Sequence, residues 1–214
     1  MFLKPLRIAV LASGRGSNLQ AIIDFIEAGK LNASIVMVVS DNKDAFALKR
    51  ASLKKIPHIF LDPAKVAERQ EYDLLLAEKI KKQGADLVVL AGWMRLLGQG
   101  FLDKFPDQVI NIHPSLLPAF PGLNAQAQAF EYGVKYTGCT VHFVDIGMDT
   151  GPIIAQEIVP IDPDDTLDSL TKKILNEEHL LYPKVIQMFS EKRISKDGRK
   201  IIIKIDDSTS ENSI

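Results

Sequence analysis

The sequence lacks the features that mark secreted, membrane-spanning and strongly charged proteins. It holds one cysteine, Cys139, so no disulfide can form within the chain and nothing indicates an oxidising compartment. No apolar run approaches the roughly 20 residues that a membrane-spanning helix needs. The formal net charge is only -1, which argues against a broad basic surface for nucleic acid. We therefore expect a cytoplasmic protein that binds neither nucleic acid nor a membrane.

Two cofactor motifs and a metal cluster are also missing. The turn SGRGSN at residues 13–18 is followed by Leu19, where the dinucleotide-binding pattern GxGxxG requires its third glycine. The pattern GxxxxGKS or GxxxxGKT of nucleoside triphosphate sites does not occur. Cysteine and histidine residues form no cluster with metal-ligand spacing, so we expect no metal.

What remains is the composition of an ordinary globular domain. Apolar residues make up 46% and charged residues 25% of 214 residues, enough to build a core without a metal or disulfide. Short apolar runs alternate with amphipathic ones through the first half of the chain. The apolar runs predict buried strands at residues 6–12, 33–39, 56–61 and 85–91. The amphipathic runs predict helices at residues 19–28, 45–53 and 70–83.

The second half predicts further strands and two helices. Strands are expected at 108–112, 138–144 and 152–159, and a helix at 125–131. Asp165 or Thr166 would cap a long helix, in which we expect a kink or break at Pro183. Asp-Gly between alternating runs predicts a hairpin within residues 194–205. Strands apolar on both faces and separated by helices are typical of α/β proteins with a mostly parallel, Rossmann-like sheet flanked by helices, here with a C-terminal hairpin.

The glycine turn at residues 13–18 lies between a predicted strand and a predicted helix. Backbone N–H groups and a helix N-terminus then point at one spot, which favours an anion such as a phosphate. Ser17 and Asn18 add side-chain donors. A tight turn that needs glycine only for its conformation is the alternative interpretation.

Two segments carry residues suited to acid–base chemistry. Asn111 and His113 are two apart at a predicted strand end, so they share a face at the edge where α/β sheets bind ligands. An amide can hydrogen-bond an oxyanion, and a histidine can transfer a proton near neutral pH. Asp149 lies in an acidic loop, and a carboxylate beside His113 would raise its pKa. The alternatives are a structural histidine and a solvated turn, because the spacing alone does not bring Asp149 to His113.

Six motifs in order carry a family resemblance: IAVLASGRGSNLQAII, SDNKDAFALKRA, LAGWMRLL, NIHPSLLPAFPG, VHFVDIGMDTGPIIAQ and NEEHLLYP. Over about residues 7–189 the sequence resembles the monofunctional glycinamide ribonucleotide transformylases of purine biosynthesis. The resemblance implies a formyltransferase fold and transfer of the formyl group of 10-formyltetrahydrofolate to the amine of glycinamide ribonucleotide. It implies small-molecule partners only, no metal, and a monomer or homodimer.

The same resemblance implies a single formyltransferase domain over residues 1–205. Its nucleotide-binding half covers about residues 1–100, its catalytic and folate half about 101–190, and its C-terminal hairpin about 194–205. Residues 206–214 are polar and small, and we expect them to form a disordered tail.

Residue by residue, the resemblance implies three sets of site residues. Asn111, His113 and Asp149 match the catalytic trio. The positions that match ribonucleotide contacts are Gly16, Ser17, Asn18, Leu175, Asn176, Glu177 and Glu178. The positions that match folate contacts are Arg69, Met94, Arg95, Leu96, Leu97, Asn111, Asp145, Ile146, Gly147, Met148 and Asp149.

The implied mechanism is direct attack of the substrate amine on the formyl carbon. Asn111 and a protonated His113 would stabilise the tetrahedral oxyanion. Asp149 would keep His113 charged or poised and would help relay a proton to the leaving N10. The family often has Lys and His after HPSLLP, whereas residues 119–124 here read AFPGLN, which leaves no basic side chain for a role there. The alternatives are a formyltetrahydrofolate hydrolase, a methionyl-tRNA formyltransferase and a non-catalytic folate- or nucleotide-binding module.

Overall fold

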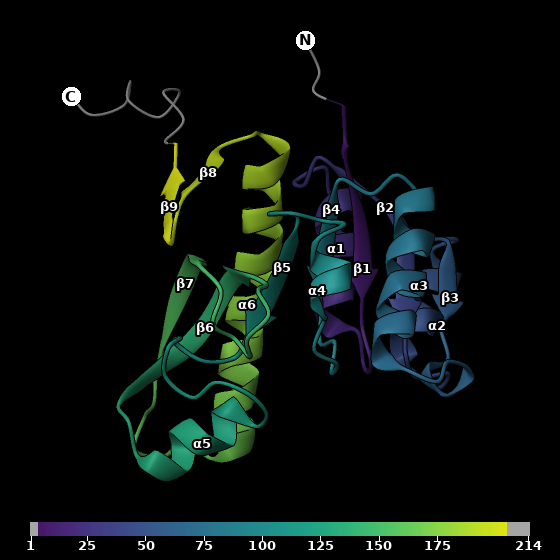
Figure 1. Ribbon diagram of the computed structural model, residues 1–214. Coiled ribbons are helices and arrows are strands. Elements are labelled where there is room, and N and C mark those ends of the chain that lie inside the picture. Colours follow the sequence, from purple (N-terminus) through teal and green to yellow (C-terminus); the bar gives the residue numbers. More distant parts are fainter. Residues whose placement is uncertain (1–3, 205–214) are drawn as a thin grey trace, which may run out of the picture.

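The computed structural model describes residues 4–204, which form a seven-stranded sheet with helices on both faces and a separate two-stranded hairpin (Figure 1). The strands of the large sheet are β1 Leu6–Leu11, β2 Ala33–Ser40, β3 His58–Phe60, β4 Leu87–Leu90, β5 Val109–His113, β6 Tyr136–Phe143 and β7 Ile153–Pro160. The hairpin strands are β8 Ile194–Asp197 and β9 Lys200–Ile203. The helices are α1 Ser17–Glu27, α2 Phe46–Leu53, α3 Arg69–Lys82, α4 Gln99–Leu102, α5 Ala125–Tyr132 and α6 Leu167–Ser190, with a 3-10 turn η1 at Pro63–Lys65.

The strand order of the large sheet is β3-β2-β1-β4-β5-β6-β7. The strands from β3 to β5 run parallel, and β6 and β7 are added antiparallel. Strands β1, β4 and β5 therefore end at the same edge of the sheet. The order reverses between β1 and β4, the kind of crevice where open α/β sheets bind their ligands.

The core is divided between the two faces of the sheet. Alternate residues of β1 point to opposite faces: Ile8 and Val10 pack on the side covered by α1 and α6, and Ala9 and Leu11 on the side covered by α3. This burial on both faces explains why the parallel strands read as unbroken apolar runs. Cys139 of β6 lies in the first cluster, fully buried as its apolar surroundings predict, and burial raises the pKa of its thiol to about 12.

The predicted fold class is confirmed, and the expected strands and helices appear with ends shifted by a few residues. The break expected at Pro183 is wrong, because α6 continues through that residue to Ser190. Proline removes one helical hydrogen bond. The buried side chains of Leu181, Tyr182, Val185 and Ile186, on both sides of it, hold the helix against the sheet. The short elements α4 and η1 were not predicted, since neither has enough turns to show a periodic pattern.

The expected tail, residues 206–214, lies outside the described residues. The division of residues 1–205 into functional halves stays a prediction. Across residues 4–204, no helix combines the length and apolar character needed to cross a membrane.

Tyr182 joins α6 to the middle of the sheet. Its hydroxyl, on a fully buried side chain, donates to the carbonyl oxygens of Leu90 (2.9 Å), at the end of β4, and Ile110 (3.1 Å), near the beginning of β5. We expect Tyr182→Phe to lower the free energy of unfolding by about 1 to 2 kcal/mol, because two buried carbonyls lose a donor. Urea unfolding measures the difference. Tyr136→Phe, which removes an exposed hydroxyl, is the control, and an equal effect of both would contradict this account.

Candidate active site

The three residues that the sequence singles out for catalysis come together at the end of β5. Asn111 and His113 lie on β5, and Asp149 lies in the loop that joins β6 to β7. His113 Nδ1 is 3.4 Å from Asp149 Oδ2, with only 6% and 13% of the two side chains exposed. Because β6 pairs antiparallel with β5, the acidic loop starts beside Ile110, and Asp149 within it reaches back to His113. The spacing of the residues could not show this contact.

His142 completes this cluster, although the sequence implied no role for it. It is the β6 partner of Asn111 in the strand register. Its Nε2 is 3.2 Å from Asn111 Nδ2 and 3.6 Å from Asp149 Oδ1, and its Nδ1 is 2.8 Å from the Phe143 carbonyl oxygen. A carbonyl only accepts, so Nδ1 carries a proton, and in the neutral ring Nε2 accepts from Asn111. A histidine within the buried apolar run of β6 was the signal that could have found it.

The segment after β5 reaches both His113 and Asp149 through its backbone. His113 Nε2 donates to the Phe120 carbonyl (2.9 Å), and the Gly122 N–H donates to Asp149 Oδ2 (2.8 Å). Gly122 has a φ of +82°, and a Cβ there would lie 3.0 Å from Met148 Sδ. The segment that carries no Lys or His therefore contacts the candidate catalytic residues without using side-chain charge.

Burial and charge act in opposite directions on His113. Burial is the larger effect and lowers the pKa of His113, while the Phe120 carbonyl and Asp149 raise it and His142 lowers it further. The net direction for the pKa of His113 is downward, so burial works against the charge that Asp149 favours. Burial raises the pKa of Asp149, but His142, the Gly122 N–H and His113 together outweigh it and hold that pKa below its ordinary value.

The glycine turn and α6 meet at a second point of the same sheet edge. Gly16 has a φ of +67°, and a Cβ there would lie 2.8 Å from Ala47, so only glycine fits. Asn18 Nδ2 donates to Glu178 Oε2 at 2.7 Å, which brings two segments 160 residues apart into contact. Ser17 begins α1, whereas Leu175, Asn176 and Glu177 precede Glu178 on α6 and are half-buried or exposed.

Glu178 is an uncommon group for a protein interior. Only 6% of it is exposed, and burial raises the pKa of its carboxyl to about 7, although the Asn18 amide opposes the shift. Asn18 Oδ1 is buried as well and finds no partner among residues 4–204. The buried amide oxygen of Asn18 and the Glu178 carboxyl lie close together and can both hydrogen-bond a polar ligand.

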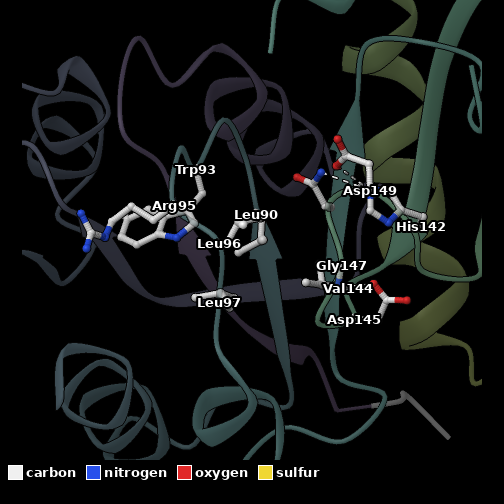
Figure 2. Close-up of a pocket in the computed structure, with 11 residues that line it drawn as sticks. Leu90, Trp93, Arg95, Leu96, Leu97, His142, Val144, Asp145, Gly147 and Asp149 are labelled. Carbon is white, nitrogen blue, oxygen red and sulfur yellow. Dashed lines mark hydrogen bonds and ion pairs between the residues drawn. The ribbon is translucent and has the colours of Figure 1, made fainter. Parts of the chain in front are cut away.

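A pocket lies between the loop after β4 and the loop after β6 (Figure 2). Of the residues expected around the folate, the pocket is lined by Arg95, Leu96, Leu97, Asn111, Asp145, Gly147 and Asp149. It is also lined by residues that the sequence did not indicate: Leu90, Trp93, His142 and Val144. The remaining expected residues are not part of this lining, and they are Arg69, Met94, Ile146 and Met148.

Those four residues lie at its margin or on the surface. Arg69 Nη2 donates to the carbonyl of Leu96, a lining residue (2.8 Å). Met94, Ile146 and Met148 are at least half exposed, so they are free to cover a bound molecule. Trp93 Nε1 is buried in the lining without a partner among the described residues. Within residues 4–204 no group of three or more His, Cys, Asp or Glu side chains is placed to hold a metal ion.

Comparison with known proteins gives one consistent family. The formyl transferase family matches residues 6–186. A trifunctional purine biosynthetic protein adenosine-3 from Drosophila melanogaster is 47% identical over 184 residues, which is 85% of this chain but only 14% of that protein. The phosphoribosylglycinamide formyltransferase of Bacillus subtilis is 43% identical over 181 residues, covering 85% of this chain and 93% of that protein.

Solved structures give the same fold. Glycinamide ribonucleotide transformylase 1 from Symbiobacterium toebii has a TM-score of 0.91 at 48% identity and covers 94% of each chain. A formyltetrahydrofolate deformylase from Pseudomonas syringae has a TM-score of 0.85 at 26% identity, covering 93% of this chain and 66% of that one. The fold therefore serves both transfer and hydrolysis, and the identity is higher on the transferase side.

Glu178 makes the stability of the protein depend on pH. Its carboxyl holds a proton up to about pH 7 in the folded state but only to about 4.5 when unfolded, so folding is favoured at low pH and this contribution is lost between these values. We expect Glu178→Gln to stabilise the protein at pH 8, on the order of 3 kcal/mol, and much less at pH 5. Thermal or urea unfolding across pH 5 to 8 measures the effect. As a control, Glu177→Gln removes an equal charge from the same helix. If the free energy of unfolding of Glu178→Gln changed with pH in the same way as that of the wild type, the assignment would be contradicted.

Proposed function

The chain belongs to the formyl transferase family, and we propose that it transfers the formyl group of 10-formyltetrahydrofolate to the amine of glycinamide ribonucleotide in purine biosynthesis. The observation that carries the proposal is the 43% identity, over 93% of its length, to a protein named phosphoribosylglycinamide formyltransferase. The meeting of Asn111, His113 and Asp149 beside a pocket supports it independently.

We assign the two substrates to the two ends of the sheet edge. The phosphate of the ribonucleotide lies at the N-terminus of α1, where Gly16, Ser17 and Asn18 supply donors. Glu178 and the other α6 residues of that stretch, Leu175, Asn176 and Glu177, contact the same substrate. The folate occupies the pocket between the loops after β4 and β6, with Arg69 and Met94–Leu97 on one side and Asp145–Asp149 on the other. Its formyl group then reaches Asn111 and His113.

In the reaction the neutral amine attacks the formyl carbon, a bond forms between the amine nitrogen and that carbon, and the bond from the carbon to folate N10 breaks. The oxyanion of the tetrahedral intermediate accepts hydrogen bonds from Asn111 Nδ2 and from His113 Nε2–H. A neutral His113 can make this bond, so catalysis does not require the imidazolium at the outset. The amine loses one proton and N10 gains one, and Nδ1 of His113, beside ionised Asp149, is placed to share in that transfer.

The amide of Asn111 is the sharpest test of these roles. Asn111→Ala removes an oxyanion donor and should lower kcat about 100-fold or more, with little change in KM for the ribonucleotide. Asn111→Asp keeps the shape but replaces the donor by an acceptor, so it should be as inactive as the alanine variant. Steady-state kinetics of the purified variants measure both. Turnover within about threefold of wild type in either variant would remove Asn111 from the mechanism.

The reaction itself is tested by following tetrahydrofolate release from 10-formyltetrahydrofolate with and without glycinamide ribonucleotide. We expect release to require the ribonucleotide and to yield the formylated product in equal amount. Release at the same rate without it would identify a hydrolase, as in the Pseudomonas relative. Saturable folate binding without any release would identify a binding module.

A further inference from the structure

Asp149 has to be held in place by its loop, because its own backbone is unusual. Its φ is +55°, in the left-handed region that few residues other than glycine adopt. Its carboxylate must reach His113, His142 and the Gly122 N–H at the same time. A small rotation of this loop therefore changes three contacts in the candidate active site at once.

Part of the support comes from within the loop. Asp145 Oδ1 accepts from the Thr150 hydroxyl (2.6 Å) and from the Gly147 N–H (3.1 Å), which closes the loop into a compact turn. Thr150 follows Asp149 directly, so its side chain fixes one side of the peptide that carries the catalytic candidate. The carbonyl oxygen of Thr150 has its partner outside this turn.

That partner comes from the C-terminal hairpin. Arg199, in the tight turn between β8 and β9, donates from Nη2 to the Thr150 carbonyl oxygen at 2.9 Å. The hairpin turn lies close to the beginning of β7, which follows the loop (Figure 1). An arginine 50 residues downstream of Asp149 thus contacts the residue next to it.

The hairpin is itself anchored, so it can act as a support. Ile194 and Ile201 pack against the core, and Arg193 Nε donates to the Lys204 carbonyl at the open end (2.7 Å). Lys196 forms an ion pair with Asp107, just before β5, and lies 5.7 Å from the Phe143 ring of β6. The hairpin therefore reaches one end of the strand that bears Asn111 and His113 and, through Arg199, the loop that bears Asp149.

We propose that Arg199 is a positioning residue for Asp149, which it holds through the Thr150 carbonyl. The inference rests on the proposed function, because it assumes that Asp149 acts on His113. Arg199 is exposed and is not among the residues that line the pocket between the loops after β4 and β6. The hairpin, which has no part in the sheet that forms the crevice, becomes a support for the catalytic loop.

The test compares three single variants of the full chain in the transferase assay: Arg199→Ala, Arg199→Lys and Lys200→Ala. Arg199→Ala should lower kcat about threefold to tenfold, in line with loss of one partly exposed charged hydrogen bond, and leave KM for the ribonucleotide within twofold. Arg199→Lys should recover part of the loss, because it keeps a donor. Lys200→Ala removes the same charge one residue away and should match wild type. Thermal unfolding of all three should agree within about 2 °C.

Two further measurements separate a positioning role from a general one. A less firmly held Asp149 stabilises the imidazolium of His113 less, which lowers the pKa of His113. Arg199→Ala should therefore shift the acidic limb of the profile of kcat against pH to lower pH. The double variant Asp149→Asn with Arg199→Ala should lose no more kcat than Asp149→Asn alone, because both substitutions act through the Asp149 carboxylate. Wild-type kcat and pH profile in Arg199→Ala, or full additivity in the double variant, would overturn the inference. Near-normal activity of Asp149→Asn would instead overturn the proposed role of Asp149.

Discussion

The candidate active site depends on the antiparallel pairing of β6 with β5. A fully parallel sheet would end with Asn111 and His113 at an open edge, facing loops from one side only. Because β6 pairs antiparallel with β5, His142 lies opposite Asn111, and the loop after β6 starts beside Ile110, near the beginning of β5. From there the loop returns along β5, and Asp149 reaches both histidines. The change from parallel to antiparallel pairing thus brings an amide, an imidazole and a carboxylate together at this strand.

Burial, more than charge pairing, sets the protonation of this site. Asp149 and His113 are in contact, yet exclusion of water lowers the pKa of His113 despite the carboxylate. At the other end of the edge, burial raises the pKa of Glu178, where the single amide contact of Asn18 does not compensate. Burial thus lowers the pKa of the imidazole and raises the pKa of the carboxyl at the two ends of the same edge. Binding of substrates removes more water and therefore changes the pKa values of both His113 and Glu178.

Backbone groups, rather than charged side chains, hold several of the candidate catalytic residues in place. The Phe120 carbonyl holds His113, the Gly122 N–H holds Asp149, and the Thr150 carbonyl receives Arg199. Such contacts depend on the path of the chain and only weakly on residue type. The segment at residues 119–124 can therefore serve the site with a sequence that carries no basic residue.

The sequence by itself determined the fold class and the family. Periodicity and apolar runs fixed the strands and helices because burial on one or both faces leaves a local pattern. Motif order led to Asn111, His113, Asp149 and the turn at Gly16. Only the tertiary structure decided that His142 joins them, that α6 passes through Pro183, that Trp93 lines the pocket, and that burial lowers the pKa of His113. These follow from strand register, packing and exclusion of water, which depend on residues distant in the chain.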